Sequence, residues 1–272
     1  MAEPLFALVT GASAGIGAAF ARELAARGHA LILTARRLDR LEALAEELRS
    51  QAGARVECIA CDLADTHAAQ FLFDETRRRG LEVDLLINNA GYGVTGSLVS
   101  REWQTHADFI QVMVTAPTEL CYRFIPAMRE RGFGRVINIA SFAGLMPAPA
   151  GHTLYAAAKS YLVRFSQSLA LENRRHGINV CALCPGFTMS EMHDVNGARA
   201  TVSSMPRWVW LDAKVVARQG LDAVERGDIV YVNGVLYRTI KALFKLVPDR
   251  LALALIARFS NSFRVADDKR KT

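Results

Sequence analysis

Short apolar or β-branched runs alternate along the chain with longer segments of helical periodicity, and this alternation constrains the fold more than any other feature. Such alternation is typical of α/β proteins with a parallel sheet. We therefore predict a Rossmann-type, doubly wound parallel sheet of about seven strands with helices on both faces. The predicted strands cover residues 6–10, 31–35, 56–60, 84–88, 135–140, 179–184 and 229–233.

The segments between these runs have the periodicity of helices. Ile16, Phe20 and Leu24 recur every four residues, which marks the buried stripe of a helix, and Gly28 ends it. Similar patterns predict helices over residues 38–51, 68–79, 102–131 and 153–176. No linker rich in proline or serine divides the chain, so we predict a single domain over residues 1–272.

Two late segments leave alternatives open. Residues 189–212 carry methionine, tryptophan and polar residues without clean periodicity, so they form either a substrate lid or an irregular surface excursion. Residues 237–264 predict a helical tail that mixes apolar and basic side chains. This tail either contacts an anionic membrane surface or docks on the domain or a partner subunit, and docking is the simpler interpretation.

Composition and cysteine usage exclude several classes of protein. The first apolar run, at residues 5–9, is too short for a signal peptide, so we expect a cytoplasmic protein. The cysteine pairs Cys58/Cys61 and Cys181/Cys184 have metal-like spacing but lie in strand-like runs. We therefore predict reduced core thiols and no metal site.

The net charge of +6 fits either an anionic ligand, such as a phosphorylated cofactor, or an ordinary basic surface. No basic block is interleaved with aromatic residues, so we expect no nucleic-acid partner.

A glycine-rich turn follows the first predicted strand and opens the first helix. Its sequence, Thr-Gly-Ala-Ser-Ala-Gly-Ile-Gly over residues 10–17, has the spacing G-x3-G-x-G. Glycines at such a junction let backbone amides approach a pyrophosphate, whose charge the helix N-terminus stabilises. Arg36 and Arg37 directly follow the second predicted strand, where an NAD-binding chain would carry an acidic residue. Two guanidiniums favour the 2′-phosphate of NADP(H).

A candidate chemical centre lies in the helix predicted over residues 153–176. Tyr155 and Lys159 are four residues apart and so share one helix face. An ammonium beside a phenol stabilises the phenolate and is expected to lower the phenol pKa, which suits a general acid/base. Ser141 ends the fifth predicted strand, at the carboxyl edge of the sheet where ligands bind.

These motifs together resemble the short-chain dehydrogenase/reductase family over about residues 5–190. The resemblance rests on residues 10–17, Asp62-Leu63, Asn88-Asn89-Ala90-Gly91, Ser141, Tyr155-x-x-x-Lys159 and Pro185-Gly186, all in the order and spacing of that family. It implies a homodimer or homotetramer that moves a hydride between NADP(H) and a carbonyl or alcohol carbon.

The resemblance also implies a role for each residue. Ser141, Tyr155 and Lys159 would be catalytic, with Tyr155 as the general acid in reduction and Lys159 bound to the nicotinamide ribose. The residues implied to line the cofactor are Gly11, Ser13, Gly15, Ile16 and Gly17 at the pyrophosphate, Arg36 and Arg37 at the 2′-phosphate, Asp62 and Leu63 at the adenine, Asn89, Ala90 and Gly91 at the adenosine ribose, and Pro185, Gly186 and Thr188 at the nicotinamide end.

Met113 departs from the pattern of the family, which usually has asparagine at this position to help hold a water that passes protons to the lysine. Methionine offers only a weak sulfur acceptor. Either the backbone carbonyl still holds the water and activity persists, or the chain binds NADP(H) with little turnover and serves as a sensor or interaction protein. Apolar residues in 142–152 and 187–210 suggest a lipophilic substrate, although core packing explains some of them.

Overall fold

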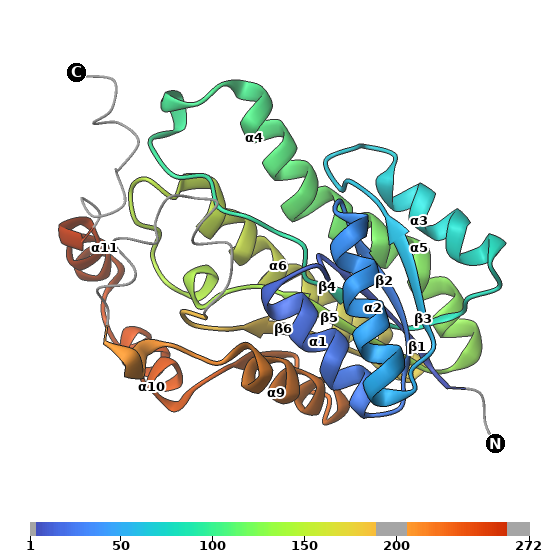
Figure 1. Ribbon diagram of the computed structural model, residues 1–272. Coiled ribbons are helices and arrows are strands. Elements are labelled where there is room, and N and C mark those ends of the chain that lie inside the picture. The colour runs from blue at the N-terminus through green and yellow to red at the C-terminus, as the bar shows by residue number, and fades with distance from the viewer. Residues whose placement is uncertain (1–3, 189–205, 260–272) are drawn as a thin grey trace.

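The computed structural model describes residues 4–188 and 206–259. Seven strands form one sheet in the order β3-β2-β1-β4-β5-β6-β7, and every neighbouring pair is parallel (Figure 1). The strands are β1 Phe6–Thr10, β2 Ala30–Ala35, β3 Val56–Ala60, β4 Val83–Asn88, β5 Gly134–Ile139, β6 Ile178–Cys184 and β7 Val230–Val232. The predicted doubly wound parallel sheet is therefore confirmed.

Helices cover both faces of this sheet because both faces of its strands are apolar. On one face, α1 Gly15–Ala26, α2 Leu38–Ala52 and α9 Ala213–Glu225 bury their side chains against the strands. On the other face, α3 Ala68–Arg78, α5 Ala116–Arg131 and α6 Thr153–Asn173 do the same. Short 3-10 turns lie at Leu98–Ser100, Phe142–Leu145, Arg174–His176 and Arg207–Val209.

The helix predicted over residues 102–131 is interrupted. It begins as α4 Trp103–Ile110, passes through a π turn at Gln111–Thr115, and continues as α5. The wide turn bonds the backbone N–H of Ala116 to the carbonyl oxygen of Gln111, five residues back. Single π turns inside α-helices occur frequently at functional sites.

The described part of the segment predicted as a helical tail, residues 237–264, contains two helices. These are α10 Val235–Phe244 and α11 Asp249–Phe259, which Pro248 separates. Within the described ranges, no helix has both the length and the apolar character needed to cross a bilayer. Most of the segment predicted as a lid, residues 189–205, lies outside the described residues.

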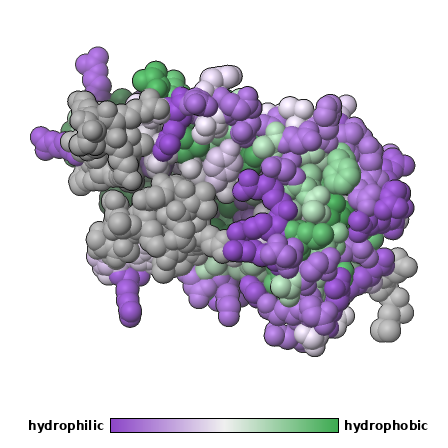
Figure 2. Space-filling model, turned by 45° about the horizontal axis from the view of Figure 1, so that its top comes forward, coloured by the Kyte–Doolittle hydropathy of each residue, from purple (hydrophilic) through white to green (hydrophobic). Residues whose placement is uncertain are grey.

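The strand order changes direction between β1 and β4, which run side by side although β2 and β3 separate them in sequence. In open parallel sheets, the crevice beyond the carboxyl ends of such strands is where ligands bind. Figure 2, in which the top of Figure 1 is turned toward the viewer, shows a hollow with hydrophobic residues in its depth and hydrophilic residues along its border.

Candidate active site

The glycine turn after β1 has a backbone that only glycine adopts readily. Gly11 and Gly15 have φ angles of 65° and 55°, in the left-handed region. A Cβ atom on Gly11 would lie 2.8 Å from the Cα of Ala90, so the turn packs tightly against the end of β4. Ala14 precedes α1 without a side-chain cap, which leaves the first backbone N–H groups of the helix available to an anion.

A hydrogen-bonded latch joins this turn to the segment after β4. The Thr10 hydroxyl accepts from the backbone N–H of Asn89 at 2.9 Å and of Ala90 at 3.0 Å. The Asn89 side-chain amide donates to the carbonyl oxygens of Thr10 at 2.8 Å and Gly11 at 3.2 Å. The structure therefore brings Asn89, Ala90 and the glycine turn together. Sequence reasoning missed the role of Thr10, whose signal is its place as the last residue of β1.

The two arginines after β2 are exposed, and one of them reaches the glycine turn. Arg37 donates a hydrogen bond of 3.2 Å from its guanidinium to the hydroxyl of Ser13. Arg36, Arg37 and Ser13 thus lie at the edge of the same crevice. Asp62 is exposed and accepts from the backbone N–H of Ala64 at 3.1 Å, whereas Leu63 is buried below it.

Ser141 and helix α6 are held together by close backbone packing. Ser141 caps the 3-10 turn Phe142–Leu145 by accepting from the backbone N–H of Ala143 at 3.1 Å. A Cβ atom on Gly144 would lie 2.7 Å from the carbonyl oxygen of Lys159, so only glycine lets this turn approach α6. Ser160 then donates to the Gly144 carbonyl oxygen at 2.8 Å.

Tyr155 and Lys159 occupy the same face of α6, as predicted. Burial raises the pKa of the Tyr155 phenol, and its hydrogen bond with Ser141 opposes that shift. Lys159 is buried, and burial lowers its pKa to about 8. Its ammonium nitrogen lies 5.8 Å from the centroid of the Tyr155 ring and donates to the carbonyl oxygen of Ile139 at 2.6 Å.

The expected lowering of the Tyr155 pKa by Lys159 is therefore wrong for this structure. Loss of hydration around the phenol raises its pKa, and the Lys159 ammonium donates its hydrogen bond to a backbone oxygen and not to the phenol. The structure does bring Ser141, Tyr155 and Lys159 together at the carboxyl edge of the sheet.

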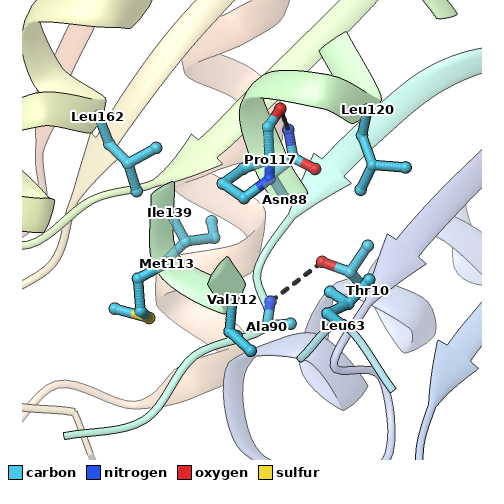
Figure 3. A pocket seen from close by; sticks show the side chains of 10 residues that line it. All are labelled: Thr10, Leu63, Asn88, Ala90, Val112, Met113, Pro117, Leu120, Ile139 and Leu162. Atoms are coloured by element: carbon cyan, nitrogen blue, oxygen red, sulfur yellow. Dashed lines mark hydrogen bonds between the residues drawn. The ribbon is translucent and has the colours of Figure 1, made fainter. Parts of the chain in front are cut away.

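Met113 lies in the π turn and is almost completely buried. Its sulfur would be 2.7 Å from a Cβ atom on Gly91, so the two residues are in direct contact. Met113 also lines a cavity of about 10 Å³ (Figure 3), roughly the space that one water requires. Asn88 borders the same cavity, and its side-chain oxygen has no hydrogen-bond partner among the described residues.

The nicotinamide end predicted at Pro185, Gly186 and Thr188 is covered by a residue that sequence reasoning did not single out. The ring of Tyr237, from α10, packs directly against Gly186. Its hydroxyl accepts from the backbone N–H of Phe187 at 3.0 Å and donates to the carbonyl oxygen of Val209 at 2.7 Å. Nothing in the local sequence marks Tyr237, because every one of these contacts is long-range.

Aromatic residues of the segments 142–152 and 187–210 lie partly beside the active-site side chains and partly at the surface. Phe142 packs edge-on against Tyr237 with ring centroids 5.1 Å apart, and the His152 ring lies 6.1 Å from that of Tyr155. Trp208, from the apolar segment 187–210, is 70% exposed. All five cysteines are free thiols, and residues 4–188 and 206–259 contain no group of three or more potential metal ligands.

A doubly wound sheet with a glycine turn at its switch point and a Ser–Tyr–Lys set at the same edge defines a class of oxidoreductases. Residues 5–200 match the short chain dehydrogenase family. The chain belongs to that family.

The chain is similar to several known proteins over most of its length. It is 31% identical over 240 residues to the 3-oxoacyl-(acyl-carrier-protein) reductase FabG of Haemophilus influenzae, covering 85% of this chain and 97% of the relative. A solved short-chain dehydrogenase from Sphingobium yanoikuyae in complex with NADPH is 30% identical, with a TM-score of 0.78 and coverage of 90% and 96%. The bulky-bulky ketone specific alcohol dehydrogenase from Comamonas testosteroni is 28% identical, with a TM-score of 0.74 and coverage of 91% and 96%.

Proposed function

We propose that this oxidoreductase is NADP(H)-dependent and interconverts a carbonyl and an alcohol on a lipophilic small molecule. The observation that carries the proposal is the convergence of Ser141, Tyr155 and Lys159 at one edge of the sheet. The glycine turn lies at the same edge. An NADPH complex among the similar structures supports the cofactor assignment.

The residues around the crevice fit a dinucleotide. A Cβ atom on Gly11 would reach the end of β4, and one on Gly17 would meet the Asn89 side chain, so both positions require glycine for the turn to pack against the segment after β4. Arg36 and Arg37 supply the charge for a 2′-phosphate, and the contact of Arg37 with Ser13 directs it toward the turn. The other cofactor contacts follow the assignments given above, with Asp62 and Leu63 at the adenine and Thr188 near the nicotinamide.

The chain positions and polarises the substrate, whereas bound NADPH supplies the hydride. Ser141 donates a hydrogen bond from its hydroxyl to the substrate oxygen. Tyr155 donates its phenolic proton to that oxygen as the carbonyl carbon is reduced, and Lys159, whose ammonium nitrogen lies 5.8 Å from the centroid of the Tyr155 ring, would hold the nicotinamide ribose. Alcohol oxidation runs through the same residues in reverse.

A panel of aliphatic and aromatic ketones, aldehydes and 3-oxoacyl esters tests the proposal by NADPH oxidation. Tyr155→Phe keeps the ring but removes the proton, so kcat should fall by about 100-fold or more while NADPH binding persists. Tyr122→Phe, at a side chain that is 77% exposed on α5, is the matched control. Turnover that survives Tyr155→Phe would remove Tyr155 from the role of general acid.

The alternative function is an NADP(H)-binding sensor or interaction protein. Met113 motivates it, because an apolar side chain fills the position of the relay asparagine. NADPH binding without turnover on any member of the panel would favour this alternative.

We propose a homodimer or homotetramer as the assembly. Tyr122 on α5 and Leu171 on α6 are 77% and 70% exposed, which provides apolar surface for subunit contact. Light scattering of the wild-type chain and of Leu171→Glu measures the assembly directly. We also propose that residues 189–212 form a substrate lid and that residues 1–272 form a single domain.

A further inference from the structure

Helix α10 has two apolar faces, and only one of them packs on the domain. Tyr237, on the inner face, is 4% exposed and anchors the helix at Phe187 and Val209. Val235 and Leu243 lie on another face and are 70% and 59% exposed. At 3.6 residues per turn, these two residues fall within about 80° of each other around the helix axis.

The following turn and helix continue this exposed apolar surface. Leu246 is 82% exposed, and on α11 Leu251 and Leu253 are 53% and 55% exposed. Among the α11 residues whose burial is described, Ala252 is the buried one. Docking on the domain, the simpler interpretation of the sequence, therefore accounts for Tyr237 and Ala252 but not for these leucines.

Basic side chains accompany the apolar ones. Residues Val235–Phe259 carry Arg238, Lys241, Lys245, Arg250 and Arg258 against the single carboxylate of Asp249. On α10, Arg238 and Lys241 lie between the inner face and the exposed apolar face, by the same helical geometry. An apolar face bordered by cations is the pattern of helices that lie in a membrane interface.

We propose that the C-terminal helix pair, residues Val235–Phe259, binds the surface of an anionic lipid membrane. Its exposed leucines enter the boundary between headgroups and acyl chains, and its lysines and arginines contact lipid phosphates. Neither helix needs to span the bilayer for this contact.

Charge argues against a second copy of the chain as the occupant. A two-fold symmetric contact places the same surface of each subunit against the other. Such a contact through the helix pair would bring the cations of one copy toward those of its partner, which is unfavourable. An anionic surface instead complements them.

The helix pair lies next to the proposed nicotinamide end, so membrane binding would have a consequence for the substrate. This consequence rests on the proposed function. Tyr237 anchors α10 at Gly186 and Phe187, next to the proposed nicotinamide end. A membrane bound there would hold lipophilic substrates beside the active site.

Vesicle sedimentation of the full chain tests the proposal without measuring activity. We expect binding to mixed phosphatidylcholine–phosphatidylglycerol vesicles, weakening with added salt, and little binding to phosphatidylcholine alone. Leu246→Glu combined with Leu253→Glu should abolish binding, and Arg238→Gln, Lys241→Gln and Lys245→Gln together should weaken it by about 100-fold. Phe71→Glu, at an exposed apolar side chain on α3 away from the helix pair, should bind like the wild type.

Molecular mass by light scattering and thermal melting by circular dichroism accompany each variant. Unchanged melting confirms that a loss of vesicle binding is not unfolding. The proposal is overturned if the wild type does not bind anionic vesicles, or binds neutral ones equally well. It is also overturned if the wild type does not bind vesicles and Leu246→Glu with Leu253→Glu splits an oligomer, since the helix pair would then be a contact between copies.

Discussion

The ammonium of Lys159 donates a 2.6 Å hydrogen bond to the carbonyl oxygen of Ile139, the last residue of β5. Because Ser141 follows two residues later, this bond ties helix α6 to the segment that carries the serine. Burial lowers the pKa of Lys159 to about 8, so the charge that makes this bond is lost within an experimentally accessible pH range.

The pH dependence of reduction should reflect this lysine. Above pH 8, free enzyme loses the Lys159 proton, so kcat/KM should fall with a limb near that pH, because kcat/KM reports ionisations of the free enzyme. Below pH 8 the lysine stays protonated and contributes no limb. Steady-state NADPH oxidation in buffers of constant ionic strength measures the profile.

Lys159→Arg is the control, since a guanidinium stays protonated to above about pH 12. If the variant keeps measurable activity, its alkaline limb should disappear. An unchanged limb in Lys159→Arg would assign the ionisation to another group.

Cofactor preference should depend on Arg37. Replacing Arg37 with alanine removes a charged donor that already contacts Ser13, so NADPH affinity should fall by about 10- to 100-fold. NADH affinity should change little, because NADH has no 2′-phosphate for the guanidinium to bind. Isothermal titration with both cofactors gives the ratio.

Arg36→Ala should act in the same direction, and Arg164→Ala on α6 provides a control at an exposed arginine that donates to Gln167 at 3.0 Å. Equal losses for NADPH and NADH in Arg37→Ala would contradict the assignment of the 2′-phosphate to these arginines.

The architecture could be predicted from the sequence because buried parallel strands are near-continuous apolar runs with a helix between each pair. The predicted and observed strand boundaries agree to within one residue at each end, and β7 is one residue shorter at each end than its predicted range of 229–233. Helix α9 was missed, since it follows the aperiodic segment 189–212 and its buried stripe (Val216, Leu221 and Val224) is short.

The site was only partly predictable, for physical reasons. Motif residues keep fixed spacing, so Ser141, Tyr155, Lys159 and the glycine turn could be named directly. The π turn around Met113 changes the hydrogen-bond pattern without a sequence signal, and Tyr237 reaches Phe187 across 50 positions of sequence. The pKa of Tyr155 depends on how many atoms surround the phenol, which spacing does not reveal.

Met113→Asn should raise kcat more than it changes NADPH affinity. The smaller, polar side chain would enlarge the cavity of about 10 Å³ beside Asn88 and give a water a second partner there. Loss of buried apolar volume should lower the free energy of unfolding by about 2 kcal/mol. Single-turnover kinetics and urea unfolding measure the two effects.

Met113→Leu separates volume from polarity. It preserves the apolar volume, so kcat should stay at the wild-type value, and stability should change by less than about 1.5 kcal/mol. An equal rise in kcat for the leucine variant would mean that the polar side chain is not responsible.

Thr10 should contribute to both stability and cofactor binding through a hydroxyl that never touches the cofactor in our proposal. It is 1% exposed, and its oxygen accepts from the backbone N–H groups of Asn89 and Ala90. Thr10→Val keeps the shape but leaves both donors without an acceptor, at a cost of about 2–4 kcal/mol in the free energy of unfolding. NADPH affinity should fall as well, because the end of β4 loses its bond to the glycine turn. Thr10→Ser retains the oxygen and should restore most of both losses; if the serine variant loses as much as the valine variant, the hydroxyl oxygen does not account for the effect.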